Sequence, residues 1–231
     1  MEQLEHKSFI YHWLEHYFHH EVVPDHLIMA VFVAVLLAGF AIWFRGRISV
    51  ENPGKLQLVL EAIVRVLQDL LVANIGTKGR PFLGLVGTLG LYILVCNLIG
   101  LVPYFSSPTT SLNMTLGCAL VAFLYYNYQG IRAHGAAKYF KHFLGPLPVL
   151  APLMLPIEII SHFSRIVSLS LRLFGNIFGE ELVIAALGMM VAFLVPVPMM
   201  LFGVFGGVLQ AFVFIMLTMV YLGGAVASEE H

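Results

Sequence analysis

An arginine lies inside one of the most apolar stretches of a very apolar chain. Residues 168–181 carry Arg172 and Asn176, followed by the carboxylates of Glu180 and Glu181. An arginine at the centre of a bilayer helix costs about 2.5–3.5 kcal/mol, and ionisable groups at that depth usually mark ion pathways or proton relays. Because arginine stays protonated, Arg172 is a fixed charge that stabilises the ionised form of a nearby carboxylate. The stretch therefore predicts ion transfer, with Glu180 and Glu181 better placed than Arg172 to relay protons.

The composition of the chain indicates an integral membrane protein. Of the 231 residues, 59% are hydrophobic and 11% are charged, whereas a soluble domain carries about 25% charged residues. The formal net charge of −1 argues against a nucleic-acid partner. Nothing resembles a nucleotide-binding loop, so we expect neither an enzyme acting on its own nor a cofactor. Cys96 and Cys118 lie in apolar segments, which is typical of small buried hydrophobic residues rather than of a redox or metal pair.

The first 25 residues form a polar segment that contains five of the ten histidines of the chain. The spacing of His12, His16, His19 and His20 would put several of them on one helical face. Such a face fits either a metal site or an amphipathic surface helix. We favour the surface helix, and expect no bound metal.

Hydrophobic runs divide the chain into the elements of a single membrane domain. We predict an all-α integral membrane protein with about five transmembrane helices and one amphipathic helix on the membrane surface. The uncharged residues 27–44 are long enough to span a bilayer, whereas residues 52–74 alternate charges with apolar residues at helical spacing, which favours the cytoplasmic surface. The remaining predicted elements are spans over 82–102 and 110–130, a long helix over 157–193 and a last span over 199–226.

The basic residues predict the orientation of these helices. Six of them fall in residues 45–80 and three in residues 132–141, while the predicted turns at 103–108 and 195–198 carry none. Basic loops remain in the cytoplasm, so both basic segments are expected there. Five spans then place the N-terminal segment 1–25 outside and the C-terminus in the cytoplasm.

One face of the long helix is predicted to be polar along most of its length. At 100° per residue, seven polar residues fall within an arc of about 120°; Ser164 widens the arc slightly, and Glu181 lies away from it. This polar stripe extends over about 22 residues, or roughly 33 Å, which is about the hydrocarbon thickness of a bilayer. Its members are Glu158, Ser161, Arg165, Ser168, Arg172, Asn176 and Glu180.

The polar stripe has a structural and a functional interpretation. Hydrogen bonds between packed helices need only serines and small residues, without a guanidinium in mid-helix. The only acids in the predicted spans lie on this same helix, so a carboxylate that answers Arg172 must come from another subunit. A self-contained secondary transporter with an anion site at Arg172 is the alternative, although no inverted repeat is visible; a scaffold without conduction leaves Arg172 unexplained. Near the start of residues 110–130, Ser111, Asn113 and Thr115 suit helix capping and an ion pathway equally.

Several motifs resemble subunit a of the bacterial F-type ATP synthase. They are SLSLRLFGN over 168–176, LQAFVFIMLTMVYL over 209–222, the ending ASEEH, NLIGLVP over 97–103 and LNMTL over 112–116. The resemblance implies a stator subunit for ATP synthesis, whose two offset half-channels carry protons to and from the carboxylates of a rotating c-ring. It further implies that the last two helices are long and tilted. The implied partners are the c-ring, the peripheral-stalk b subunits, the F1 sector indirectly and the lipid of the bacterial inner membrane.

The resemblance also implies roles for individual residues. Arg172 is the essential charge that faces the c-ring, drives deprotonation and blocks leakage. Some relatives carry a histidine where this chain has Gly203, and Glu180 is expected to supply a replacement group; many carry an aspartate where this chain has Ser111. The implied outer half-channel contains Asn113, Asn176, Glu181 and Gln210, and the implied cytoplasmic half contains Glu158, Ser161, Ser164 and Ser168.

Overall fold

The computed structural model describes residues 24–102, 105–135, 139, 151–190 and 196–226. Every regular element in these ranges is a helix, which confirms the all-α class. The N-terminal histidines for which a metal site and a surface helix were considered lie outside the described residues. In chain order the helices are α2 (Asp25–Arg45), α3 (Lys55–Ile75), η2 (Thr77–Phe82), α4 (Leu83–Ile99), η3 (Pro108–Thr110), α5 (Leu112–His134), α7 (Ala151–Met190) and α8 (Pro196–Val226).

The start of α7 differs most from the prediction, since the helix begins at Ala151 rather than at residue 157. The prolines between these positions suggested a loop. Proline fits the first turn of a helix, where the N–H groups have no partner within the helix, and Pro156 in the second turn removes one further hydrogen bond. The predicted end at residue 193 lies outside the described residues.

Four helical segments in the described ranges are long and apolar enough to cross a membrane: Asp25–Arg45, Gly79–Ile99, Pro152–Gly188 and Pro198–Val226. The 23 residues of α5 are sufficient in number, but the sequence YYNYQ over 125–129 makes its second half more polar. A span over 110–130 therefore stays a prediction. Since α5 packs against both α7 and α8, Tyr126 and Asn127 have protein partners, whereas Tyr128 is exposed.

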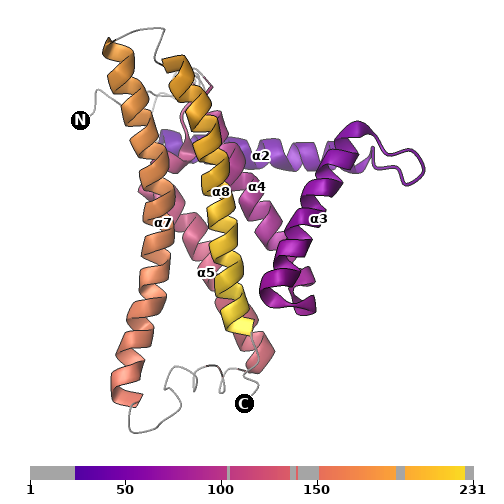
Figure 1. The fold of residues 1–231 in the computed structure, drawn as a ribbon, viewed down its shortest axis with the longest axis vertical. Helices are drawn as coiled ribbons and strands as arrows, with labels where there is room; N and C mark the ends of the chain where they lie inside the picture. Colours follow the sequence, from indigo (N-terminus) through magenta and orange to yellow (C-terminus); the bar gives the residue numbers. More distant parts are fainter. Residues whose placement is uncertain (1–23, 103–104, 136–138, 140–150, 191–195, 227–231) are drawn as a thin grey trace.

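The helices α7 and α8 are longer than the hydrocarbon core of a bilayer is thick. The 21 residues of α2 extend about 31 Å at 1.5 Å per residue, which matches a hydrocarbon core of about 30 Å. The 40 residues of α7 extend about 60 Å and the 31 residues of α8 about 46 Å. In Figure 1, α2 lies across the direction in which α7 and α8 run together. Their lengths suit tilted helices, and their tilt in the membrane stays a prediction.

Two clusters of buried apolar side chains hold the bundle together. The first joins α4, α5, α7 and α8, and the second joins α3, η2 and α4 to the C-terminal halves of α5 and α8. Gly90 permits α4 to approach α8 closely, because a Cβ atom there would overlap the side chain of Ile215. Cys96 and Cys118 are both buried as free thiols. The first cluster contains Ile93, Cys118, Ala119, Ala122, Leu169, Leu173, Ala211 and Phe214.

The helix α3 is amphipathic and packs against the side of the bundle. It contacts α8, η2 and α4, with Leu71 fully buried, while Lys55, Arg65 and Asp69 are exposed. Gly76 follows the helix with a φ angle of 80°, a conformation that favours glycine, and the chain then turns into η2. This division into an apolar and a charged face is typical of a helix at a membrane surface.

Candidate functional site

Arg172 lies on the face of α7 that the other described helices leave open. The packed face is formed by Leu169, Leu173 and Ile177, whose exposures are 3%, 0% and 5%. Arg172 is exposed, as is Gly175 one turn further on. Within the described ranges, Arg172 has no hydrogen bond and no ion pair. The guanidinium group is therefore presented at the surface of an apolar helix without a counter-charge from this part of the chain.

Part of the polar stripe follows the contact between α7 and α8, which are antiparallel (Figure 1). Near one end, the guanidinium carbon of Arg165 lies 5.4 Å from the centroid of the Tyr221 ring. Eleven residues further along each helix, Asn176 donates a hydrogen bond from Nδ2 to Oε1 of Gln210. Arg172 lies between these two contacts, at a level where α8 presents no charged side chain in the described range.

Gln210 is a polar residue that is almost fully buried beside the polar stripe, with an exposure of 2%. Its Oε1 atom accepts the hydrogen bond from Asn176, but its Nε2 atom has no partner among the described residues. A buried donor without a partner costs about 1–3 kcal/mol, and an ordered water is the usual way to satisfy such a group. The pair Asn176 and Gln210 thus marks a position between the long helices that suits a water molecule.

The carboxylate of Glu180 occupies space that a glycine on α8 leaves free. A Cβ atom at Gly203 would overlap Oε1 of Glu180 and would lie 2.8 Å from its Cδ atom. At Gly206, one turn along, a Cβ atom would lie 3.3 Å from Oε2. This chain thus brings an ionisable group from α7 into the space that Gly203 leaves free on α8.

Glu181 faces away from the polar stripe, as its helical angle predicts, toward the connection between α4 and α5. Its carboxylate accepts a hydrogen bond from the backbone N–H of Ser107. The Ser107 hydroxyl lies 2.9 Å from the carbonyl oxygen of Cys96 and 2.8 Å from the hydroxyl of Thr109. The second glutamate is thereby attached to a buried polar turn, whereas Glu180 faces α8.

The same buried turn is bonded to α8 through Asn97. Thr109 donates a hydrogen bond of 2.8 Å to Oδ1 of Asn97, and Nδ2 of Asn97 donates one of 3.1 Å to the carbonyl oxygen of Gly207. Asn97 and Thr109 have exposures of 3% and 0%. Sequence reasoning missed this network, although Asn97 in an apolar run was a visible signal. The network fixes the turn against the two helices that carry Glu181 and Gln210.

Three polar residues at the start of α5, for which helix capping and an ion pathway were both considered, lie in different environments. Ser111 is the N-cap residue of α5, although its side chain makes no capping hydrogen bond. Asn113 is exposed. Thr115 is fully buried, and its hydroxyl shares a hydrogen bond of 3.1 Å with Ser170 of α7. Ser170 is not a member of the polar stripe, because it faces α5, so the wheel did not single it out.

At the other end of α7, the polar residues divide between the open surface and the contact with α5. Ser164 and Ser168 are exposed and Ser161 is half-buried. Oε1 of Glu158 lies 3.4 Å from Nε2 of His162. His162 was absent from the sequence-based site, although its spacing of four residues from Glu158 was an available signal for a side-chain pair.

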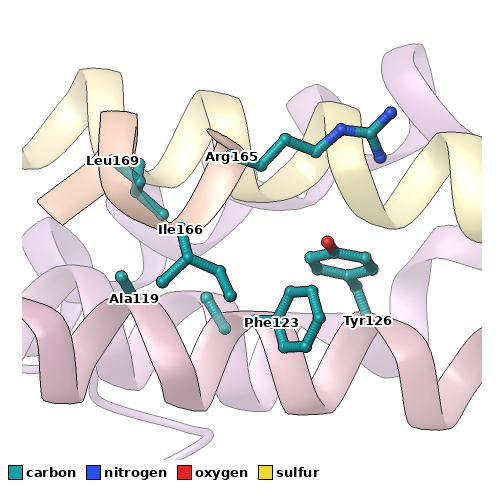
Figure 2. Close-up of a pocket in the computed structure, with 7 residues that line it drawn as sticks. Ala119, Phe123, Tyr126, Arg165, Ile166 and Leu169 are labelled. Atoms are coloured by element: carbon teal, nitrogen blue, oxygen red, sulfur yellow. The ribbon is translucent and has the colours of Figure 1, made fainter. Parts of the chain in front are cut away.

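A small cavity lies between α5 and α7 next to this group of residues. Figure 2 shows the Tyr126 hydroxyl pointing from α5 toward α7, with the Arg165 side chain extending from α7 nearby. The rest of the wall is apolar, and the space is about that of a single water molecule. The lining residues are Ala119, Ala122, Phe123, Tyr126, Arg165, Ile166 and Leu169.

Tyr139, just beyond the end of α5, closes the bundle at the same end. Its hydroxyl donates a hydrogen bond of 2.7 Å to Oδ1 of Asn127. Burial raises the pKa of Tyr139, which keeps the hydroxyl protonated and able to donate. The ring lies against Gly130, where a Cβ atom would come within 2.5 Å of it.

The acids and the histidine of α7 form two separate groups. Glu158 and His162 lie near one end, and Glu180 and Glu181 lie toward the other. In the described part of the chain, no set of three or more His, Cys, Asp and Glu residues could hold a metal ion. The chemistry that these groups can support is the transfer of protons past a fixed positive charge.

Comparison with known proteins gives a consistent result over most of the chain. Residues 27–223 match the family described as ATP synthase A chain. Proteins named ATP synthase subunit a are similar to it: that of Geotalea daltonii is 47% identical, covering 86% of this chain and 85% of its own. That of Campylobacter fetus is 45% identical, covering 89% and 91%, and that of Citrifermentans bemidjiense is 50% identical, covering 78% and 76%. The chain therefore belongs to the ATP synthase A chain family.

Proposed function

We propose that this chain is the stator subunit of the membrane sector of a rotary ATP synthase, and that it carries protons to and from a rotating c-ring. Family membership supports a membrane subunit of an ATP synthase. The finer proposal is carried by Arg172, which is exposed near the middle of the 37-residue apolar segment Pro152–Gly188 and has no counter-charge among the described residues. The acids of α7 lie on both sides of it, Glu158 about 21 Å and Glu180 about 12 Å away along the helix axis.

The outer half-channel in this proposal uses the polar groups on the C-terminal side of Arg172. Asn176 and Gln210 provide hydrogen-bonding groups and an unsatisfied donor that suits water. Glu180 and Glu181 are the groups of this half that can take up and release protons. Asn113, which is exposed at the start of α5, completes the set.

The cytoplasmic half-channel uses the polar residues on the N-terminal side. Ser164 and Ser168 are exposed on α7, about two turns and one turn before Arg172. Ser161 and the partly exposed carboxylate of Glu158 continue the route toward the helix end. Because Ser164 and Ser168 are not covered by α5 or α8, this route is completed by the surface of another subunit.

Arg172 performs two tasks in the mechanism. A carboxylate of the c-ring that comes next to it is stabilised in its ionised form, so it releases its proton on one side and accepts another only after moving on. A fixed positive charge also repels a proton that would pass directly between the two half-channels. Each charge that crosses 100 mV contributes about 2.3 kcal/mol, so several protons must cross for each ATP formed elsewhere in the complex.

The proposed partners and placement follow from the same role. The c-ring faces Arg172, the peripheral-stalk b subunits hold the chain against rotation, and the F1 sector is reached through them. The four apolar helical segments support a membrane location, which we assign to the bacterial inner membrane. The basic segments are placed in the cytoplasm with the C-terminus, and the N-terminus outside.

ATP-driven proton pumping into inverted membrane vesicles tests this function. Arg172→Ala is expected to abolish pumping while the c-ring still co-purifies with the chain. Arg172→Lys keeps a charge but loses the planar fork, so we expect partial activity. Arg132→Ala, which removes an exposed arginine at the end of α5, is the matched control and is expected to pump normally. Near-normal pumping by Arg172→Ala would overturn the proposal, and a chain that purifies alone and binds an anion through Arg172 would establish the transporter alternative.

A further inference from the structure

We propose that His162 is a proton-relay residue at the cytoplasmic end of α7, where it passes protons between the buried hydroxyl of Tyr126 and the surface carboxylate of Glu158. This inference rests on the proton transport proposed above and adds two residues to it, because the polar stripe includes neither His162 nor Tyr126. It is carried by three side chains in contact, contributed by α5 and α7.

The three side chains form a line of contacts from the surface into the bundle. The Glu158 side chain is 37% exposed, and its Oε1 atom lies 3.4 Å from Nε2 of His162, whose side chain is 12% exposed. On the opposite edge of the ring, Nδ1 shares a hydrogen bond of 3.2 Å with the hydroxyl of Tyr126, a residue with an exposure of 2%. Each ring nitrogen therefore has a partner that can give or accept a proton, and exposure falls at every step inward.

Beyond Tyr126, the line reaches the cavity between α5 and α7. Tyr126 and Leu169 lie at opposite ends of the cavity in Figure 2. Leu169 is three residues, or about one helical turn, before Arg172, and the next residue, Ser170, shares its buried hydrogen bond with Thr115. A water molecule in the cavity would connect the phenol to the level of α7 at which the c-ring carboxylate is expected.

Aromatic side chains lie around the His162 ring. The ring stacks on Tyr126 with a centroid distance of 6.1 Å, and it meets Phe123 edge-on at 6.1 Å. Charges of opposite sign flank it on its own helix, so the site provides groups that stabilise both the neutral and the charged ring. Among the described residues, the charged and titratable groups around it are Glu158 and Arg165 on α7, Tyr126 on α5, Tyr139 just beyond α5 and Tyr221 on α8.

The proton transfer balances without any further reactant. During ATP hydrolysis, Glu158 takes a proton from the cytoplasm and gives it to Nε2, and the imidazolium that forms releases the Nδ1 proton toward Tyr126 and the cavity water. One proton has moved, and reorientation of the neutral ring together with proton exchange through neighbouring water restores the starting tautomer. During synthesis the steps run in reverse. Histidine suits this step because imidazole gains and loses protons in the physiological pH range.

The test uses the whole complex in inverted vesicles, with the proton gradient dissipated so that ATP hydrolysis reports proton passage through the chain. His162→Ala is expected to lower the coupled rate about tenfold or more, within the range that a lost general acid–base group produces. Imidazole added on the exposed cytoplasmic side is expected to restore part of that rate. The matched control, His134→Ala, changes a histidine at the end of α5 and is expected to show neither effect.

Two measurements separate a relay from a packing role. The deficit of His162→Ala is expected to grow as the pH rises, because a relay matters most where free protons are scarce. Tyr126→Phe keeps the stacked ring and removes only the hydroxyl, so it is expected to lower the coupled rate of ATP hydrolysis with the complex intact. If His162→Ala fails to assemble, Tyr126→Phe decides between a relay and a packing role. A rate within twofold of the native one, or a loss that imidazole and pH leave unchanged, would overturn the relay. If Arg172→Ala pumps normally the proposed function itself fails, whereas a normal His162→Ala beside an inactive Arg172→Ala removes the relay alone.

Discussion

Replacing Gly203 by alanine is expected to displace the Glu180 carboxylate and to reduce proton transport much more than stability. The new methyl group would overlap Oε1 of Glu180 and would lie 2.8 Å from its Cδ atom and 2.9 Å from Cδ2 of Leu101. Ordinary contacts of a Cβ atom lie at 3.4–4 Å, so the Cδ atom must withdraw by about 0.6–1.2 Å and Oε1 must move further, or the side chain must turn to another rotamer. Because flexible side-chain ends make these contacts, the free energy of unfolding should fall by no more than about 1 kcal/mol, the low end of the range for overpacking.

The effect on transport follows from the size of that displacement. A misplacement of about 1 Å at a reacting group can reduce a rate by about 100-fold, so we expect ATP-driven pumping to fall by roughly 10-fold to 100-fold. The assay is pumping by inverted vesicles, normalised to the amount of assembled complex. Gly224→Ala is the matched control, because it is the same substitution on the same helix at a position with no atom within 4 Å.

A second substitution tests whether Glu180 is the cause. Glu180→Asp shortens the side chain by one carbon–carbon bond, about 1.5 Å, which clears the new methyl group. The double variant Glu180→Asp with Gly203→Ala should therefore pump better than Gly203→Ala alone. Pumping by Gly203→Ala at the level of Gly224→Ala would refute the reasoning, since it would mean that a carboxylate in this space is not needed.

Three further predictions concern contacts between the helices. Asn176→Ala and Gln210→Ala should each reduce pumping, and the double variant should be little worse than either, because each substitution breaks the same hydrogen bond. In a double-mutant cycle of the free energy of unfolding we expect a coupling of about 0.6–1.7 kcal/mol, and simple additivity would contradict this. Thr115→Val leaves the Ser170 hydroxyl without its partner, so the free energy of unfolding should fall by about 1 kcal/mol. This loss should appear as a lower thermal midpoint of the assembled complex, and an unchanged midpoint would show that the bond contributes nothing. Gly90→Ala overpacks the contact between α4 and α8 and should destabilise the subunit by about 1–3 kcal/mol, measured as resistance to denaturation in detergent, with Gly84→Ala, which meets no atom within 4 Å, as its control.

Much of the fold could be predicted from periodicity and charge alone, because a bilayer permits few solutions. Backbone groups in lipid must be satisfied within the segment, so apolar runs of sufficient length become helices, as in α2 and α8. The start of α7 could not be predicted in this way, because Pro152 and Pro156 suit either a loop or the first turns of a helix. The character of α5 was also ambiguous, since its polar second half is accounted for only by its packing against α7 and α8.

By itself, the sequence determined that Arg172 and the other members of the polar stripe share one side of a long helix, because helical angle depends only on spacing. It could not determine what each of them meets, because that depends on which helix lies opposite and at what height. Only the tertiary structure decided that Asn176 bonds to Gln210, that Glu180 occupies the space at Gly203 while its neighbour Glu181 faces Ser107, and that Arg172 has no partner in the described chain. It also brought together His162 and Tyr126, which lie 36 residues apart, because α5 and α7 pack with their polar ends at the same level.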